Sequence, residues 1–149
     1  MEWSILFTIN WILFFILVDW KTFKKNVFGG LFITVVEIFV DYHYTSLGLY
    51  TIHDPIIEFL GSSLFFSLGP VFVIGTLMAQ YHPHKRWMIV VNIIVIFILY
   101  SIMELILVKR GVVEYINWSY FASLIINIGA MTIQSWFIII VLGKWREKR

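Results

Sequence analysis

The segment HPHKRWMIVVNIIVIFILYSIMELILV, residues 82–108, combines the two features that decide the fold. It opens with a short basic turn around Lys85-Arg86 and continues into an apolar run over residues 87–108. A bilayer core requires about 20 consecutive apolar residues in helical form, so this run is long enough to cross a membrane. We therefore expect a transmembrane helix whose first end is held at a membrane surface by positive charge.

Four further apolar stretches of similar length surround this segment. Together with it they give predicted spans at residues 3–20, 26–45, 55–80, 87–108 and 119–142. Backbone polar groups in lipid must bond within the chain, which favours helices, and the alternating pattern of a membrane β-barrel is absent. The predicted fold is an all-α polytopic membrane protein, a bundle of five transmembrane helices. It forms a single integral-membrane domain over residues 1–149.

Composition supports a lipid environment and excludes several classes of function. The chain is 60% hydrophobic and 13% charged, with a mean hydropathy of +0.89, whereas soluble domains carry about 25% charged residues. The net charge of +2 is small and concentrated at span ends, so no nucleic-acid partner is expected. The absence of cysteine excludes disulfides, thiolate metal sites and cysteine nucleophiles. No phosphate loop or nucleotide fingerprint occurs, and we expect no cofactor.

The basic residues fix the predicted orientation. Nine of the eleven lie in three clusters at span ends, Lys21, Lys24, Lys25, Lys85, Arg86, Lys144, Arg146, Lys148 and Arg149. An outside N-terminus puts these nine inside and leaves only Lys109 and Arg110 outside, as the positive-inside rule favours. The first residues carry no basic n-region, so we expect the first apolar run to be retained as a span. The predicted location is the plasma membrane, multi-pass, with the C-terminus inside.

The ends of the second and third spans are set by local signals. The second is short unless its helix continues through Asp41 to about Thr45, and we expect Gly48 to end it. The third opens with Asp54-Pro55-Ile56-Ile57-Glu58, where an N-cap Asp followed by Pro predicts a helix start. This third span is rich in Gly and Ser, which favour close helix packing, and Pro70 predicts a kink. We therefore expect it to be the central helix.

Carboxylates within the spans predict a site. Gly30, Thr34, Glu37 and Asp41 are spaced four, three and four apart, so they share one helix face. A charged side chain at a span centre costs about 2.5–3.5 kcal/mol and normally faces a bundle interior or a wet cavity. Other polar groups are expected at the same outer depth. The predicted ligand-binding residues are Glu37, Asp41, Glu104, Glu58, His43 and Asn127, whose oxygen and imidazole groups suit a divalent metal or protons.

Plainer interpretations of the same residues stay open. Asp41 could mark the membrane interface, and Glu58 could be a solvated acid in the first turn of its helix. Glu104 could turn outward and pair with Lys109 or Arg110. His43 could be an ordinary polar residue beside a loop. No His-x-x-x-His or Glu-x-x-His pair occurs, so the sequence names no metal.

One resemblance to a known group of proteins rests on a few residues in a five-span chain of this length. These residues are Asp41 and the following Gly48-Leu49-Tyr50. The chain resembles small uncharacterised five-span membrane proteins of spore-forming Gram-positive bacteria. The resemblance covers the span pattern and these few residues. It implies a bacterial membrane location and carries no activity over to this chain.

The leading functional hypothesis is a non-enzymatic membrane protein. Its outward-facing acidic site would take a cation, a proton or a small cationic solute, as a transport or accessory subunit. Besides the lipid bilayer, its expected partners are further copies in a homo-oligomer or a larger membrane complex. A second hypothesis is a membrane-embedded enzyme that uses Glu37 and Glu104 as an acid and base on a lipid or isoprenoid. A third is a purely structural assembly partner.

Overall fold

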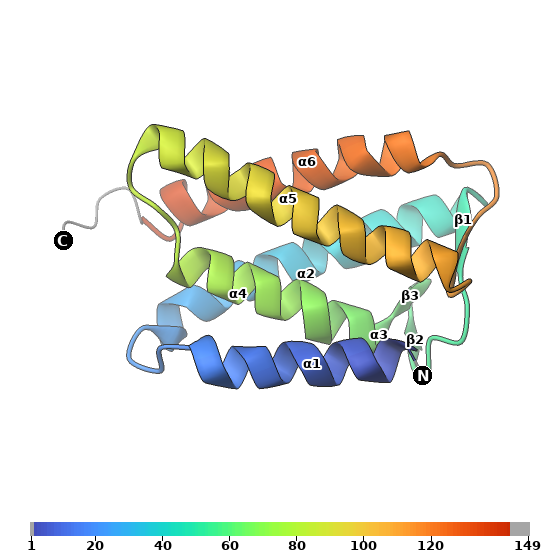
Figure 1. Ribbon diagram of the computed structural model, residues 1–149, viewed down its shortest axis with the longest axis horizontal. Coiled ribbons are helices and arrows are strands. Elements are labelled where there is room, and N and C mark those ends of the chain that lie inside the picture. The colour runs from blue at the N-terminus through green and yellow to red at the C-terminus, as the bar shows by residue number, and fades with distance from the viewer. Residues whose placement is uncertain (1, 144–149) are drawn as a thin grey trace.

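The computed structural model describes residues 2–143, and this part of the chain is mostly helical, with five helices (Figure 1). This confirms the predicted helical class. The helices are α1 (Glu2–Leu17), α2 (Phe23–Ser46), a third helix in three parts, α5 (Arg86–Lys109) and α6 (Tyr120–Ile140). The third helix consists of α3 (Leu64–Phe66), the π-helical turn η1 (Ser67–Val71) and α4 (Phe72–Gln80). The basic cluster at residues 144–149 lies outside the described residues.

Two of the described helices, α5 and α6, are long and apolar enough to cross a membrane, judged by length and composition. The helices Glu2–Leu17 and Leu64–Gln80 are apolar but shorter. Large apolar side chains of α5 lie on the surface rather than in the interior. The exposed ones include Val90, Val91, Ile94, Val95, Ile98, Leu99, Ile102 and Ile106. An apolar face of this extent on a soluble protein would mark an interaction surface.

The connections gather at opposite ends of the bundle. The α1–α2 and α4–α5 connections lie at one end, and the N-terminus and the α5–α6 connection lie at the other (Figure 1). At this second end β1 (Tyr50–Ile52) pairs antiparallel with β4 (Val113–Tyr115), placing Tyr50 opposite Tyr115. A short hairpin of β2 (Glu58–Phe59) and β3 (Ser62–Ser63) precedes α3. We call the β1–β4 pair the roof.

The third helix starts at Leu64, so the predicted start at Pro55 is wrong. Asp54 and Ile56 have φ angles of 49° and 63°, in the left-handed region, where a right-handed helix cannot continue. The chain instead turns back through the β2–β3 hairpin. The Ser63 hydroxyl donates to the Pro55 carbonyl at 3.0 Å, and the Leu64 N–H donates to the Ile57 carbonyl at 2.9 Å. These bonds outweigh the local N-cap signal.

The second helix ends close to the residue that the sequence predicts. It runs without a break past Asp41 to Ser46, close to the expected end at Thr45. Gly48 follows with a φ of +72°, the left-handed conformation that commonly ends a helix. Its N–H donates to the Thr45 carbonyl at 3.0 Å. The continuation carries Asp41 into the bundle on the same helix as Glu37.

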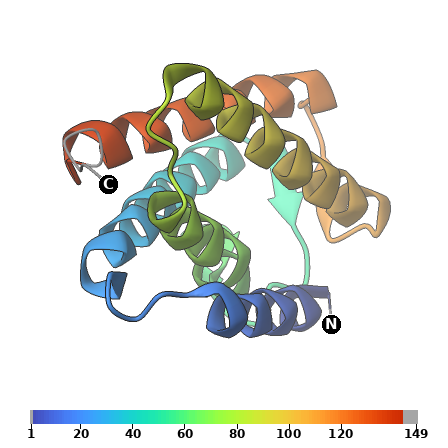
Figure 2. The ribbon, with the colours of Figure 1, turned by 60° about the vertical axis from the view of Figure 1, so that its left-hand side comes forward.

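The third helix is the central one, as predicted. In Figure 2, α4 lies in the middle of the bundle, and it contacts α1, α2 and α6. Within Leu64–Gln80 only Leu68 is exposed. Pro70, which has no N–H to donate, sits in the π-helical turn η1, at the residue where the sequence predicts a kink. Gly69, one residue earlier, lies against Phe7 of α1.

The closest helix contact is the crossing of α2 and α4. A Cβ atom on Gly30 would lie 2.1 Å from the Thr76 Oγ1 and 2.8 Å from the Phe72 carbonyl oxygen. A Cβ on Gly75 would lie 3.0 Å from the Gly29 carbonyl oxygen. Helices in lipid gain little from the hydrophobic effect, so close packing of this kind holds them together. The crossing therefore fixes the face of α2 that meets the rest of the bundle.

Helix α6 is tied to the same crossing through a buried amide. The Gln134 Nε2 donates to the Gly29 carbonyl at 2.9 Å and to the Gly75 carbonyl at 3.2 Å. The side chain is fully buried. One residue of α6 thus holds both α2 and α4. With α2 fixed on both sides, the next two turns of its inner face carry Glu37 and Asp41 toward α5 and α6.

Candidate functional site

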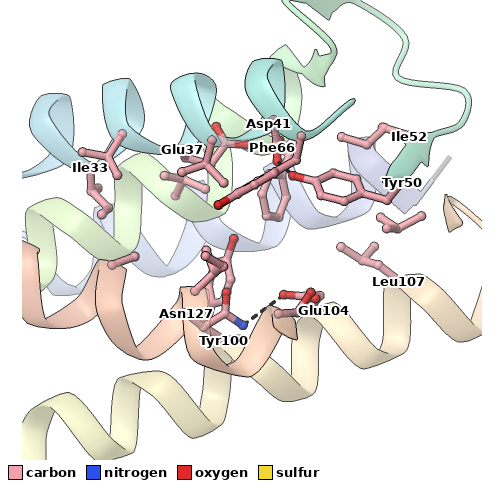
Figure 3. A pocket seen from close by; sticks show the side chains of 18 of the residues that line it. Ile33, Glu37, Asp41, Tyr50, Ile52, Phe66, Tyr100, Glu104, Leu107 and Asn127 are labelled. Atoms are coloured by element: carbon pink, nitrogen blue, oxygen red, sulfur yellow. Dashed lines mark hydrogen bonds between the residues drawn. The ribbon is translucent and has the colours of Figure 1, made fainter. Parts of the chain in front are cut away.

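A cavity of about 110 Å³ lies beneath the roof, between α2, α5 and α6 (Figure 3). Most of its wall is apolar. Four of the residues predicted for a site line it, namely Glu37 and Asp41 from α2, Glu104 from α5 and Asn127 from α6. Figure 3 shows Glu37 and Asp41 on one wall and Glu104 on the opposite one. Side chains distant in the sequence thus meet in one space.

Glu37 accepts a hydrogen bond at each carboxylate oxygen. The Ser62 hydroxyl donates to Oε1 at 2.9 Å, and the Ser67 hydroxyl donates to Oε2 at 2.7 Å. Both serines are fully buried, one in β3 and the other at the start of η1. The hairpin and the π-helical turn therefore bring both donors to a carboxylate on another helix.

Asp41 lies one turn further along α2 and bonds to the roof. The Tyr50 hydroxyl, from β1, donates to the Asp41 Oδ1 at 2.6 Å. Burial raises the pKa of the Tyr50 hydroxyl well above its ordinary value, and the charge of Asp41 raises it further. The hydroxyl therefore keeps its proton and acts as a donor at every physiological pH. Asp41 thus faces the cavity rather than the bundle surface.

Glu104 is held from the roof and from α6. The Tyr115 hydroxyl, from β4, donates to one carboxylate oxygen, and the Asn127 Nδ2 donates to the other at 3.0 Å. Burial raises the pKa of the Tyr115 hydroxyl, and its hydrogen bond to Glu104 contributes in the same direction. The tyrosine therefore remains a donor. The two paired strands of the roof each supply one tyrosine to one acid.

The interpretation of Glu104 as an outward-turned residue is not supported. It would have required an ion pair with a basic residue at the end of α5. The nearby Arg110 instead donates to Glu2 of α1 at 3.0 Å. Glu104 faces inward because it lies one turn after Tyr100 on the helix face that meets the cavity.

The cavity brings carboxyl groups together without a positive side chain. Over residues 2–143, no Lys, Arg or His lines it. Its carboxylates are bonded by hydroxyl and amide groups, which donate hydrogen bonds but carry no compensating charge. An isolated charge in a medium of low dielectric is very costly. The described lining therefore gives these carboxyl groups hydrogen bonds but no positive side chain.

His43 and Glu58, the remaining predicted site residues, do not line this cavity. His43 is exposed and its ring stacks beside Phe39, with ring centroids 6.2 Å apart. It follows Asp41 by two residues, or roughly 200° around the helix, so it faces away. Glu58 is exposed in β2 because the third helix starts later than predicted. The prediction of one shared site does not hold for these two residues.

A divalent metal site of three ligands is not formed either. In the described part of the chain, no three His, Cys, Asp or Glu side chains lie close enough to hold a metal ion. The two carboxyls on α2 interact with each other, while Glu104 lies across the cavity. The site is therefore an acidic cavity with separated charges.

Several residues of the site were not predicted from the sequence. The sequence predicts the serines at positions 62 and 67 as small packing residues, and it gives no indication of a role for the tyrosines at positions 50 and 115. Tyr100 and Ser123 fall on the polar faces that also carry Glu104 and Asn127. That spacing is the signal that could have identified them. The roof tyrosines have no such signal, because their contacts depend on pairing between distant strands.

No family model, no curated protein and no solved structure matches this chain. The assignment therefore depends on the geometry of the cavity alone.

The Tyr50–Asp41 bond predicts a measurable stability effect. Tyr50→Phe is expected to lower the free energy of unfolding by about 1–2 kcal/mol, because the hydrogen bond to the half-buried Asp41 carboxyl group is lost. Tyr42→Phe is the control, since Tyr42 is 51% exposed. Unfolding by SDS in mixed micelles measures both. Equal midpoints for the two variants would contradict a stabilising role of the roof.

Proposed function

We propose that the chain is a non-enzymatic integral membrane protein whose acidic cavity binds a cation, a proton or a small cationic solute. The single observation that carries this proposal is the meeting of Glu37, Asp41 and Glu104 in one cavity whose described lining has no basic side chain. The protein acts as a transport or accessory subunit, in an oligomer or a larger membrane complex. The cavity faces the outer side of the plasma membrane.

The membrane assignment is supported by the surface and by the charges. Apolar side chains cover the outside of α5, which lipid solvates and water does not. The α1–α2 and α4–α5 connections carry Lys21 and Lys85 and lie together at one end of the bundle (Figure 1). The positive-inside rule places that end in the cytoplasm. The roof and the cavity then lie toward the outside.

The hydrogen bonds that the carboxyl groups accept favour a binding function over a catalytic one. Both oxygens of Glu37 accept hydrogen bonds from serines, and both oxygens of Glu104 accept bonds from Tyr115 and Asn127. A general acid or base needs free access to the proton that it transfers. Fixed carboxylates in a small cavity suit a preorganised binding site better.

The proposal predicts a cation- and pH-dependent change in stability. A bound cation stabilises the folded state by RT ln(1 + [L]/Kd), or about 2.7 kcal/mol at one hundred times Kd. Thermal unfolding of the purified protein in detergent is measured against pH and against salts of monovalent and divalent cations. The wild type is expected to respond, and Glu37→Gln is expected to lose most of the response.

Glu58→Gln is the matched control, because it removes an exposed carboxylate outside the cavity. It is expected to respond like the wild type. A wild type that responds to no cation and no pH step would overturn the proposal. So would an unchanged response in Glu37→Gln.

The orientation can be tested with single cysteines, since the chain has none of its own. The two variants are Asn117→Cys and His84→Cys. Asn117 is exposed in the α5–α6 connection, and His84 lies in the α4–α5 connection. Neither change alters the count of Lys and Arg. A membrane-impermeant maleimide applied to intact cells is expected to label position 117 and not position 84. The reverse pattern, or equal labelling before lysis, would contradict the outward-facing cavity.

A further inference from the structure

We propose that the natural ligand of the acidic cavity is a small organic ammonium ion. This inference rests on the proposed function, since it names the chemical class of the cation. It draws on three features of the cavity beyond its acids, namely its aromatic wall, the Tyr100 hydroxyl and its volume.

The wall combines aromatic rings with the carboxylates. Seven of the lining residues are aromatic, namely Trp3, Tyr44, Tyr50, Phe66, Tyr100, Tyr115 and Trp118. Aromatic faces attract cations, most strongly when water is excluded, and such cages recognise substituted ammonium groups. Ca²⁺ and Mg²⁺ instead require six or more oxygen ligands at about 2.0–2.6 Å. A wall of rings and aliphatic side chains does not supply that shell.

Tyr100 places a free donor and acceptor inside the cavity. Its side chain projects into the space between the α2 acids and Glu104 (Figure 3). Within residues 2–143 its hydroxyl has no hydrogen-bond partner, and it interacts electrostatically with Glu37 and Glu104. The Tyr100 side chain is half-buried, so a molecule in the cavity can bond to its hydroxyl. The hydroxyl oxygen accepts a hydrogen bond only from a ligand with an ammonium N–H, whereas the ring face attracts any ammonium ion, including tetramethylammonium, which has no N–H.

The volume limits the ligand to a few heavy atoms. An engineered cavity of about 150 Å³ holds benzene, which has six heavy atoms. The cavity here is about 110 Å³, so a cation of roughly four or five heavy atoms fits it. Tetramethylammonium and the simple alkylammonium ions are of this size. A bare Na⁺ or K⁺ ion would leave most of the aromatic wall without contact.

The test uses the fluorescence of the cavity tryptophans in the full-length wild-type protein in detergent. Tetramethylammonium chloride replaces sodium chloride at constant ionic strength, and tert-butanol, of similar size and uncharged, is titrated separately. Tetramethylammonium is expected to bind saturably, at least tenfold more tightly than sodium. The response to tert-butanol is expected to be unsaturable.

Each outcome that differs from this expectation contradicts the ammonium inference or both proposals. Equal or tighter binding of sodium, potassium or a divalent cation at a site sensitive to Glu37→Gln would overturn the ammonium inference and leave the proposed function standing. Binding of tert-butanol as tight as that of tetramethylammonium would overturn it too. The absence of a response to any cation or to pH would overturn both proposals.

Variants at Tyr100 separate the ring from the hydroxyl. Tyr100→Phe is expected to keep tetramethylammonium binding within about threefold, because the ring remains. Tyr100→Leu is expected to weaken it about tenfold or more, as loss of a desolvated cation–π contact requires. Size-exclusion chromatography and circular dichroism check folding. Wild-type affinity in a folded Tyr100→Leu would contradict the aromatic cage, and the comparison of cations in the wild type stands without this variant.

Discussion

Gly30→Ala is expected to lower the free energy of unfolding by about 3 kcal/mol, the upper end of the usual cost of overpacking. The added methyl would lie 2.1 Å from the Thr76 hydroxyl and 2.8 Å from the Phe72 carbonyl oxygen. The hydroxyl could rotate away, but the carbonyl belongs to α4 and can move only if the helices separate. Separation breaks the close α2–α4 contact, for which the proposed lipid environment offers no hydrophobic compensation.

Helix propensity acts in the opposite direction and is too small to reverse the result. Alanine is favoured over glycine in a helix by about 1 kcal/mol. Gly129→Ala isolates this contribution, since a Cβ at Gly129 of α6 meets no atom within 4 Å. That control is expected to be neutral or to stabilise by up to about 1 kcal/mol. SDS unfolding of both variants is the measurement, and a neutral Gly30→Ala would contradict the crossing.

Trp3→Ala is expected to cost about 2–3 kcal/mol. The Trp3 side chain is 1% exposed, it meets Phe66 edge-to-face at 5.8 Å, and its indole N–H donates to the His53 carbonyl at 2.9 Å. Truncation of a buried Trp in a soluble core costs about 3–5 kcal/mol, part of which is transfer from water. That part is reduced in lipid, while the lost packing and the lost hydrogen bond remain.

Trp87→Ala is the matched control, because Trp87 at the start of α5 is 65% exposed. Its expected effect is below about 0.5 kcal/mol, as for most surface positions. Both variants are compared by SDS unfolding in the same micelles. If Trp87→Ala destabilises as much as Trp3→Ala, the burial of α1 against the cavity wall is contradicted.

The helical period alone predicted the core of the site. Glu37 and Asp41 share a face of α2, and Glu104 and Asn127 lie on the inner faces of α5 and α6, as the spacing of polar residues indicates. The end of α2 at Ser46, just before Gly48, also follows from a local rule. These features depend on residues within one or two turns of each other, which a sequence displays directly.

The features that the sequence did not predict correctly depend mostly on long-range contacts. The Asp54-Pro55 signal is a valid helix start by local chemistry, yet hydrogen bonds from Ser63 and Leu64 hold this segment in a turn. The roof pairs Tyr50 with Tyr115 across 65 residues, and no local pattern predicts that register. The predicted site includes His43 because it is close to Asp41 along the chain. Residues two positions apart on a helix, however, face different sides of it.

The central claim is that cations and protons exchange at Glu37, Asp41 and Glu104. The most direct measurement is proton release from weakly buffered protein in detergent as tetramethylammonium or a metal cation is added. The wild type is expected to release protons saturably, with the same midpoint as cation binding, because a cation binds the ionised form of a carboxyl group in preference to the protonated form. The triple variant Glu37→Gln, Asp41→Asn, Glu104→Gln is expected to release none. Saturable release that survives in this variant, or no release by any cation across the pH range of stable folding, would contradict the account.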